Sequence, residues 1–165
     1  MPALTTGKQA PHFSLPLLSQ GSFSLAEAQK KGPVLAAFFK VSCPTCQYAF
    51  PFIQRLFAGY GDSKVTIVGI SQNDVPDTKR FTSEFQITFP IALDDIKKYP
   101  VSNSFGLTNV PTLFWISPSG EIELTSIGWS KPEMEQLNQR LAASTGRGLI
   151  QLFRPGESVA EFKAG

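Results

Sequence analysis

The most regular hydrophobic pattern lies in the first half of the chain. Residues 34–39 are all apolar, and residues 65–70 are nearly so. Continuous rather than alternating apolarity predicts central strands that are covered on both faces. Between them, Gly59 and Gly61 end a helical pattern made by Phe50, Ile53, Leu56 and Phe57. Strand, helix and strand within about 40 residues predict a βαβ unit with two parallel strands.

The second half predicts another helix and an antiparallel hairpin. A helix is expected after Pro76, because Phe81 and Phe85 lie four residues apart and share one face. Residues 112–116 form a further strand candidate, and a Pro-Ser-Gly turn connects it to a returning strand over residues 121–127. The residues of that strand expected to face inward are Ile122, Leu124 and Ile127.

The predicted elements at the two ends complete the picture. Ser130 and Glu133 fit a capping box before the last predicted helix, whose apolar stripe is Met134, Leu137 and Leu141. At the front, residues 13–17 and 22–25 flank a Gln-Gly turn and predict a small hairpin. The predicted fold class is α/β, with a parallel unit first and an antiparallel hairpin later.

Composition and charge exclude several classes of function. The chain has 165 residues, of which 42% are hydrophobic and 17% are charged, as in a globular protein with one domain. The net charge is +2 and no run of Lys and Arg exceeds two residues, so nothing indicates binding to nucleic acid or to an acidic membrane surface. No segment is long and apolar enough to span a bilayer.

The two ends of the chain suggest a location and a boundary. Residues 1–8 lack the apolar core of a secretory signal, so we expect a cytoplasmic protein. The alternative is a periplasmic or secreted protein from which a leader has been removed. We expect residues 1–145 to form the domain. In residues 146–165, Gly, Pro and charged residues interrupt the periodicity, which predicts a mobile C-terminal extension.

The candidate chemistry lies where the first predicted strand ends and its helix begins. Cys43 and Cys46 are the only two cysteines. The unpaired N–H groups and the macrodipole of a helix start would favour a thiolate at Cys43, and Pro44 suits the first helical turn. Cys46 would lie about one turn further, near enough to form a disulfide but more buried. Thiol–disulfide exchange needs such an exposed attacking thiol and a second, resolving thiol.

Other interpretations of the polar residues are less favoured. Zinc needs four ligands, and besides the two cysteines the chain has a single histidine, His12, so no metal site is predicted. A structural disulfide across so short a loop would constrain little chain entropy. We expect His12 to be a surface or packing residue and Lys40 to be solvated. Asp94 and Asp95 are expected to form a turn or a helix cap rather than a metal or acid–base pair.

Several motifs resemble the thioredoxin superfamily, in particular its TlpA/ResA-like and AhpC/TSA-related members. Residues 43–46, Cys-Pro-Thr-Cys, match the redox motif of these proteins, and residues 110–112, Val-Pro-Thr, match their cis-proline loop. Pro51 matches a proline that bends the active-site helix. The remaining similar segments are residues 10–15, 23–25 and 31–35, which resemble the N-terminal hairpin region, and residues 87–94, which resemble an inserted strand and helix.

The resemblance implies a thioredoxin-like fold, with a central mixed sheet flanked by helices, and a thiol–disulfide oxidoreductase. Cys43 would attack a substrate disulfide, and Cys46 would resolve the mixed disulfide. Pro111 would shape the substrate groove, and Val110 would offer its backbone N–H and C=O to an extended peptide. The other substrate-binding residues would be Ser42, Pro44 and Thr45.

The same resemblance implies partners but no dissociable cofactor. The substrate would be a disulfide-containing protein or small molecule, and a further redox partner would regenerate the dithiol. Reduction is the favoured direction, since the cytoplasm is reducing. A bacterial origin and antioxidant activity would accompany this function.

Three departures from the family pattern bear on mechanism. Ser42 stands where many thioredoxins have tryptophan, and Ala37 stands where many have a buried carboxylate. Neither Thr45 nor Ala49 supplies the glutamate that some ResA-like proteins carry. Without such a carboxylate, Cys46 would lose its proton to water or to the substrate thiolate.

Two alternative functions stay open. A peroxiredoxin is one, because residues 42–45 resemble the run around some peroxidatic cysteines. However, Ala36 and Lys40 stand where the peroxide site would need proline and threonine. The other alternative is a non-catalytic protein-binding module with a thioredoxin-like fold.

Overall fold

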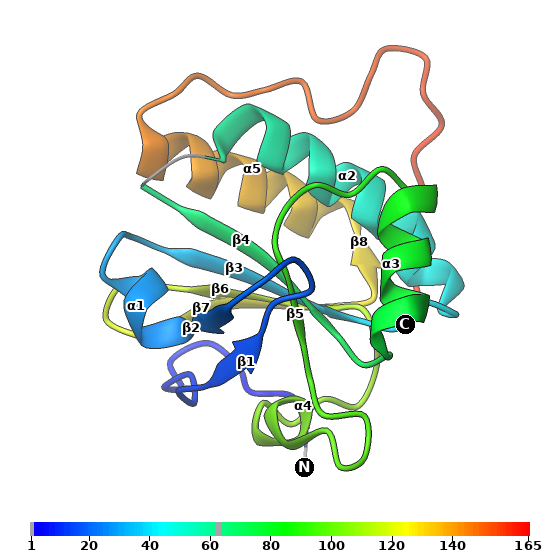
Figure 1. The fold of residues 1–165 in the computed structure, drawn as a ribbon. Coiled ribbons are helices and arrows are strands. Elements are labelled where there is room, and N and C mark those ends of the chain that lie inside the picture. The colour runs from blue at the N-terminus through cyan, green and yellow to red at the C-terminus, as the bar shows by residue number, and fades with distance from the viewer. Residues whose placement is uncertain (1, 62–63) are drawn as a thin grey trace.

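The computed structural model describes residues 2–61 and 64–165 and is built around a five-stranded sheet (Figure 1). The strand order is β5-β4-β3-β6-β7, in which β3, β4 and β5 are parallel and β6 is antiparallel to both β3 and β7. These strands are β3 (Val34–Phe39), β4 (Thr66–Ser71), β5 (Ile91–Leu93), β6 (Thr112–Ile116) and β7 (Ile122–Ile127). The expected α/β class and mixed sheet are confirmed.

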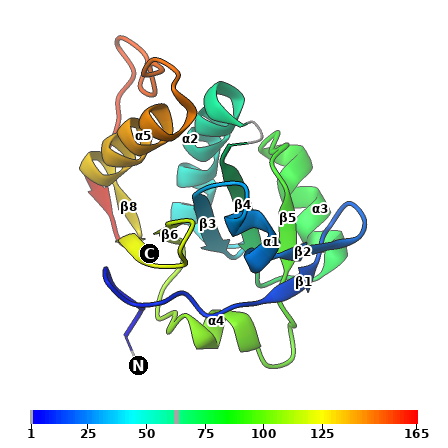
Figure 2. The ribbon, with the colours of Figure 1, turned by 90° about the vertical axis from the view of Figure 1, so that its left-hand side faces the viewer.

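Helices cover both faces of this sheet (Figure 2). One face packs against α2 (Pro44–Tyr60), α3 (Val75–Glu84) and α5 (Lys131–Thr145). The opposite face packs against α1 (Leu25–Gln29), α4 (Pro100–Ser104) and the hairpin of β1 (Ser14–Pro16) and β2 (Ser22–Ser24). The sheet therefore separates two hydrophobic cores.

β3 contributes to both cores. Side chains alternate between the two faces of a strand. Three of its residues pack on the α2 side, namely Leu35, Ala37 and Phe39, and three pack on the hairpin side, namely Val34, Ala36 and Phe38. All six are completely buried. Burial on both faces explains the uninterrupted apolar run from which this strand was predicted.

One prediction of side-chain orientation is wrong. Ile127 is 41% exposed, whereas Ser126 beside it is buried. Ile122 and Leu124 are buried as expected, although a β-bulge sends them into different cores. From Leu124 onward the side chains alternate, which places Ser126 on the buried face with Leu124 and Ile127 on the other. The predicted hairpins, the βαβ unit and the capped last helix are confirmed.

The inserted strand and helix are β5 and α4, and Asp94 connects them. Its carboxylate accepts hydrogen bonds from the N–H groups of Val101 (3.3 Å) and Ser102 (2.8 Å), in the first turn of α4. The hydroxyl of Ser102 donates to the same carboxylate at 2.7 Å. The expected capping role is therefore confirmed. However, the helix lies beyond residues 87–94, so that stretch contains the strand alone.

The chain returns over α5 and α2 after the last helix (Figure 1). α5 ends at Thr145, and Gly146 follows in a left-handed conformation with φ +72°. The last residues form β9 (Phe162–Lys163), antiparallel to β8 (Trp129–Ser130). The division into a domain over 1–145 and a mobile extension over 146–165 stays a prediction, and Met1 lies outside the described residues. Within the two described ranges, no helix is long and apolar enough to cross a membrane.

Candidate active site

Cys43 caps the N-terminus of α2 at the end of the sheet where β3 leaves it. Its backbone is extended, and Pro44 follows in the first turn of the helix. The Cys43 sulfur accepts a hydrogen bond from the N–H of Cys46 at 3.1 Å. A helix N-terminus has unpaired N–H groups, and the Cys43 sulfur pairs one of them.

The cis-proline loop lies beside Cys43, next to the end of the neighbouring strand β6. The Val110–Pro111 peptide bond is cis, and it comes directly before β6, the strand that pairs with β3. The Cys43 thiol donates a hydrogen bond to the backbone oxygen of Val110 at 3.4 Å. The structure thus brings together the two motifs that the sequence separates by more than sixty residues.

The two thiols differ in burial. Cys43 is half-buried, whereas Cys46 is completely buried among the apolar residues between α2 and the sheet. Burial raises the pKa of the Cys46 thiol far above its usual range, and its hydrogen bond with Cys43 raises this pKa further. Backbone hydrogen bonding at Lys40 lowers it by less. None of these contributions comes from a carboxylate, which agrees with the alanine at position 37.

The loop that leads into Cys43 is held by two side chains that the sequence analysis missed. Asn73 accepts a hydrogen bond from the N–H of Val41 at 2.9 Å, and the Gln47 side chain donates to the backbone oxygen of Val41 at 2.9 Å. Both backbone groups of Val41 are therefore paired. Asn73 lies two residues after the end of β4. The carboxyl ends of neighbouring parallel strands lie side by side, and this is the signal that could have indicated its contact with the loop after β3.

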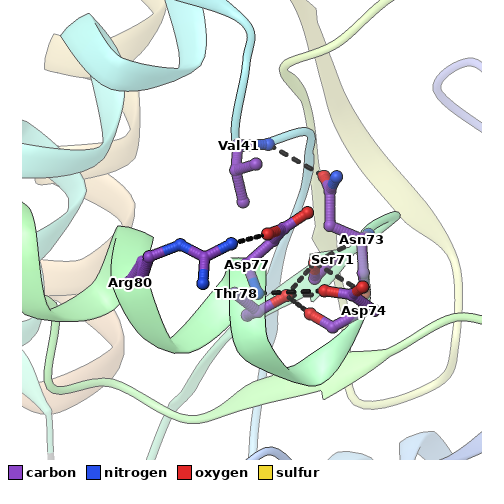
Figure 3. A network of polar contacts seen from close by, with 7 residues as sticks. All are labelled: Val41, Ser71, Asn73, Asp74, Asp77, Thr78 and Arg80. Atoms are coloured by element: carbon purple, nitrogen blue, oxygen red, sulfur yellow. Dashed lines mark hydrogen bonds and ion pairs between the residues drawn. The ribbon is translucent and has the colours of Figure 1, made fainter.

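Asn73 belongs to a polar network at the start of α3 (Figure 3). The hydroxyl of Ser71 accepts a hydrogen bond from the N–H of Asn73 at 3.0 Å and contacts the hydroxyl of Thr78 at 2.8 Å. Asp74 caps α3 by accepting a hydrogen bond from the N–H of Asp77 at 2.9 Å, and Asp77 pairs with Arg80. These contacts fix the segment that presents Asn73 to Val41.

The other predicted site residues surround the two cysteines. Ser42 and Pro44 are exposed, Pro111 is buried, and Thr45 donates a hydrogen bond to the backbone oxygen of Ala164 at 2.7 Å. Beside Val110 lies a polar hollow of about 210 Å³, whose lining includes Lys40, Gln72 and Asn109. His12 and Lys40 are exposed, as expected.

A larger hollow lies away from these residues. It has about 450 Å³ and is lined by residues such as Phe57, Val65 and Thr66. These residues lie at the opposite ends of β4 and α2 from the cysteines. This hollow therefore does not belong to the cysteine site.

Comparison with known proteins decides the family. The family model of the AhpC/TSA family matches residues 6–125. The chain belongs to the AhpC/TSA family. Thiol-disulfide oxidoreductase ResA of Halalkalibacterium halodurans is 31% identical over 129 residues, which cover 78% of this chain and 72% of the relative. ResA of Oceanobacillus iheyensis is 32% identical over 122 residues, or 71% of this chain and 62% of the relative.

A solved structure supports the same assignment. A thiol:disulfide interchange protein DsbE from Chlorobium tepidum matches 87% of this chain and 100% of its own, at 26% identity and a TM-score of 0.75. This AhpC/TSA family member is thus a TlpA/ResA-like protein of the thioredoxin superfamily and a thiol–disulfide oxidoreductase. An enzyme of this class takes a disulfide substrate and exchanges electrons with a redox partner.

We expect Asn73→Ala to disturb the loop before Cys43. A buried N–H that loses its acceptor costs about 1–3 kcal/mol. The Val41 N–H is part-buried, so the free energy of unfolding should fall by about 1 kcal/mol, the lower end of this range. The rate at which iodoacetamide alkylates Cys43 should change with it. Asn73→Asp keeps an oxygen acceptor and should preserve both quantities. Equal unfolding free energies for wild type and Asn73→Ala would contradict the role assigned to Asn73.

The raised pKa of Cys46 predicts a loss of stability in alkali. Above an unfolded-state pKa of about 8.5, the unfolded chain releases the Cys46 proton while the folded chain retains it. Stability from this group is therefore complete below about pH 8.5 and decreases above it, by up to about 1.4 kcal/mol per pH unit. Urea unfolding of wild type and Cys46→Ala between about pH 7 and 10 measures the difference. Parallel pH profiles for the two proteins would contradict the burial argument.

Proposed function

We propose that Cys43 is the attacking thiol of this oxidoreductase and Cys46 the resolving thiol. The observation that carries the proposal is the position of Cys43. Its sulfur lies at the start of α2, within hydrogen-bond distance of the Cys46 N–H and of the Val110 oxygen. It is also the more exposed of the two sulfurs. Cys46, completely buried behind it, is accessible only to a partner already bonded to Cys43.

The reaction consists of two exchanges. The Cys43 thiolate attacks one sulfur of a substrate disulfide, which forms a Cys43–substrate disulfide and releases the other substrate sulfur as a thiolate. The Cys46 thiolate then attacks the Cys43 sulfur, forms the Cys43–Cys46 disulfide and releases the second substrate thiolate. The substrate gains two electrons and two protons, and the enzyme dithiol loses them. A reducing partner must then return the Cys43–Cys46 disulfide to the dithiol.

The second exchange requires the removal of a proton from Cys46. Burial raises the pKa of this thiol, and the substrate thiolate released in the first exchange is a base formed beside it. Proton transfer from Cys46 to that thiolate, or to water, generates the second nucleophile. Ala37 cannot assist, because it has no ionisable group. Resolution is therefore the step that this site assists least.

The proposed substrate groove runs past the cis-proline loop. Val110 supplies backbone groups for an extended chain, and Pro111 shapes the wall beside Cys43. Ser42, Pro44 and Thr45 form the opposite rim. Ser42 and Pro44 are exposed and Val110 is half-buried, which supports their access to a substrate.

The proposed direction is reduction of the substrate in the cytoplasm, where thiols are kept reduced. In the alternative locations, the periplasm or the cell exterior, the same site would need a dedicated reductant as its partner. A peroxidase function has no support from the site. Of the positions that would hold a peroxide, Ala36 is buried in the core on the hairpin side and Lys40 is solvated.

We expect Cys46→Ser to accumulate mixed disulfides through Cys43. Serine cannot displace the substrate, so incubation with insulin should give a covalent adduct that is visible on non-reducing gels and reversed by dithiothreitol. Cys43→Ser is the matched control and should form no adduct and reduce no insulin. Insulin reduction by Cys43→Ser at the wild-type rate would disprove the assignment of the attacking thiol.

A further inference from the structure

The last residues of the chain lie across the proposed substrate groove. After α5, the chain runs back over α5 and α2 and ends beside the start of α2 (Figure 1). Figure 2 shows β9 alongside β8 on the side of the sheet that carries α2 and α5. No other described element comes between this terminal strand and β8, because the two are hydrogen-bonded neighbours.

The part of this segment up to Ala160 is firmly held. Leu152 is buried in the core with α2 and α5, and its backbone oxygen accepts a hydrogen bond from Arg55 at 2.9 Å. The same guanidinium makes a double hydrogen bond with Glu157, at 2.8 and 2.7 Å, and lowers the pKa of Glu157 to about 2. The indole N–H of Trp129 donates to the backbone oxygen of Ala160 at 2.6 Å.

The segment beyond Ala160 behaves like an added strand. Lys163 lies opposite Trp129 in the β8–β9 pair, and the N–H of Lys131 donates to the backbone oxygen of Glu161 at 2.9 Å. These contacts are made by backbone groups rather than by side chains. The Phe162 side chain is 65% exposed. In strand addition of this kind, the hydrogen bonds are made to backbone groups, so extended chains of many sequences can bind in the same way.

The final two residues contact both halves of the active site. The Thr45 hydroxyl, from the Cys-Pro-Thr-Cys motif, donates to the backbone oxygen of Ala164 at 2.7 Å. The side chain of Asn109, from the cis-proline loop, donates to a backbone oxygen of Gly165 at 3.3 Å. A Cβ on Gly165 would lie only 2.6 Å from the Val110 oxygen, the atom that accepts the hydrogen bond of the Cys43 thiol.

The segment up to Ala160 and residues 161–165 therefore differ in how easily they can dissociate from the rest of the protein. Residues 161–165 are all exposed, although two of them contact the site. Up to Ala160 the segment has a buried side chain, one ion pair with two hydrogen bonds and an indole hydrogen bond. Beyond it, the segment is held by the β8–β9 pairing, by the hydrogen bonds of Thr45 and Asn109, and by Lys163 over the Tyr48 ring. Another extended chain could replace the pairing and the two hydrogen bonds, which are made to backbone groups. This contrast suits a displaceable cover.

From these contacts we propose that residues 162–165 occupy the site of an extended polypeptide substrate, so that a protein disulfide must displace them to reach Cys43. The inference rests on the proposed function, because it assigns the substrate groove to Thr45, Val110 and the free edge of β8. It names the substrate class as polypeptide disulfides. A small disulfide, which does not need the β8 edge, competes with these residues less.

The test compares the wild type with a chain that ends at Glu161. This variant keeps the contacts of Arg55, Trp129 and Lys131, and thermal unfolding checks that it remains folded. Its KM for insulin should fall by about tenfold, because residues 162–165 no longer occupy the substrate groove in most of the molecules. Its KM for oxidised glutathione should fall by less than about twofold. Phe162→Ala, which keeps the backbone pairing, is the matched control and should behave as the wild type.

A second variant displaces the cover without shortening the chain. In Gly165→Val the new Cβ meets the Val110 oxygen, so the KM for insulin should fall as it does in the shortened chain. An unchanged or higher KM for insulin in both variants would overturn the inference, even if the wild type reduces insulin normally.

Alkylation of Cys43 in the reduced protein by a bulky maleimide gives a readout that does not depend on turnover. Faster alkylation in both variants than in the wild type and Phe162→Ala supports the cover, even if no insulin is reduced and the proposed function fails. Equal alkylation rates in all four proteins would overturn it.

Discussion

The antiparallel pairing of β3 with β6 is the interaction on which the active site depends. Its register sets Phe38 opposite Thr112, so the chain that leaves β3 and the chain that enters β6 meet at the same end of the sheet. Cys43 lies a few residues after the first strand, and Val110 lies just before the second. A shift of one residue would move every side chain of a strand to the other face. The two cores on either side of the sheet therefore enforce the register that places Val110 against Cys43.

Unequal burial then gives the two thiols different chemistry. Cys43 lies at the cap of α2, where backbone N–H groups point outward, and Cys46 lies one turn further on the face that packs against the sheet. The helix thus presents one sulfur to a substrate and keeps the other behind it. The rigidity of this arrangement comes from Val41, whose N–H and C=O are bound by Asn73 and Gln47. The price of burial is a Cys46 thiol that resists losing its proton.

Much of the fold could be predicted, because burial on both faces leaves a direct mark on the sequence. The run over β3 and the stripe of α5 are examples, and the Cys-Pro-Thr-Cys and Val-Pro-Thr motifs indicated the site. Ile127 was mispredicted because hydrophobicity outweighed the strict alternation that places Ser126 inside. The hydrogen bond between the Val41 N–H and the Asn73 side chain connects residues that follow two different strands. No local sequence pattern indicates such a pair.

The course of residues 146–165 could not be predicted for a related reason. This segment has no periodic apolar pattern. It is held by isolated pairs of residues that are far apart in the sequence, such as Arg55 with Glu157 and Trp129 with Ala160. Its final strand is bound through backbone groups, which every residue possesses. A sequence pattern records side chains, so contacts of the backbone leave no trace in it.

The central claim is that Cys43 and Cys46 form a reversible redox pair, and its most direct test is the equilibrium redox potential. The protein would be equilibrated in dithiothreitol or glutathione buffers, and its thiols trapped and counted by mass spectrometry. We predict an intramolecular Cys43–Cys46 disulfide with a potential near about −270 mV, as in thioredoxin-type reductants. A value near about −120 mV would reverse the proposed direction. If no such disulfide forms at any potential, the account of the active site is wrong.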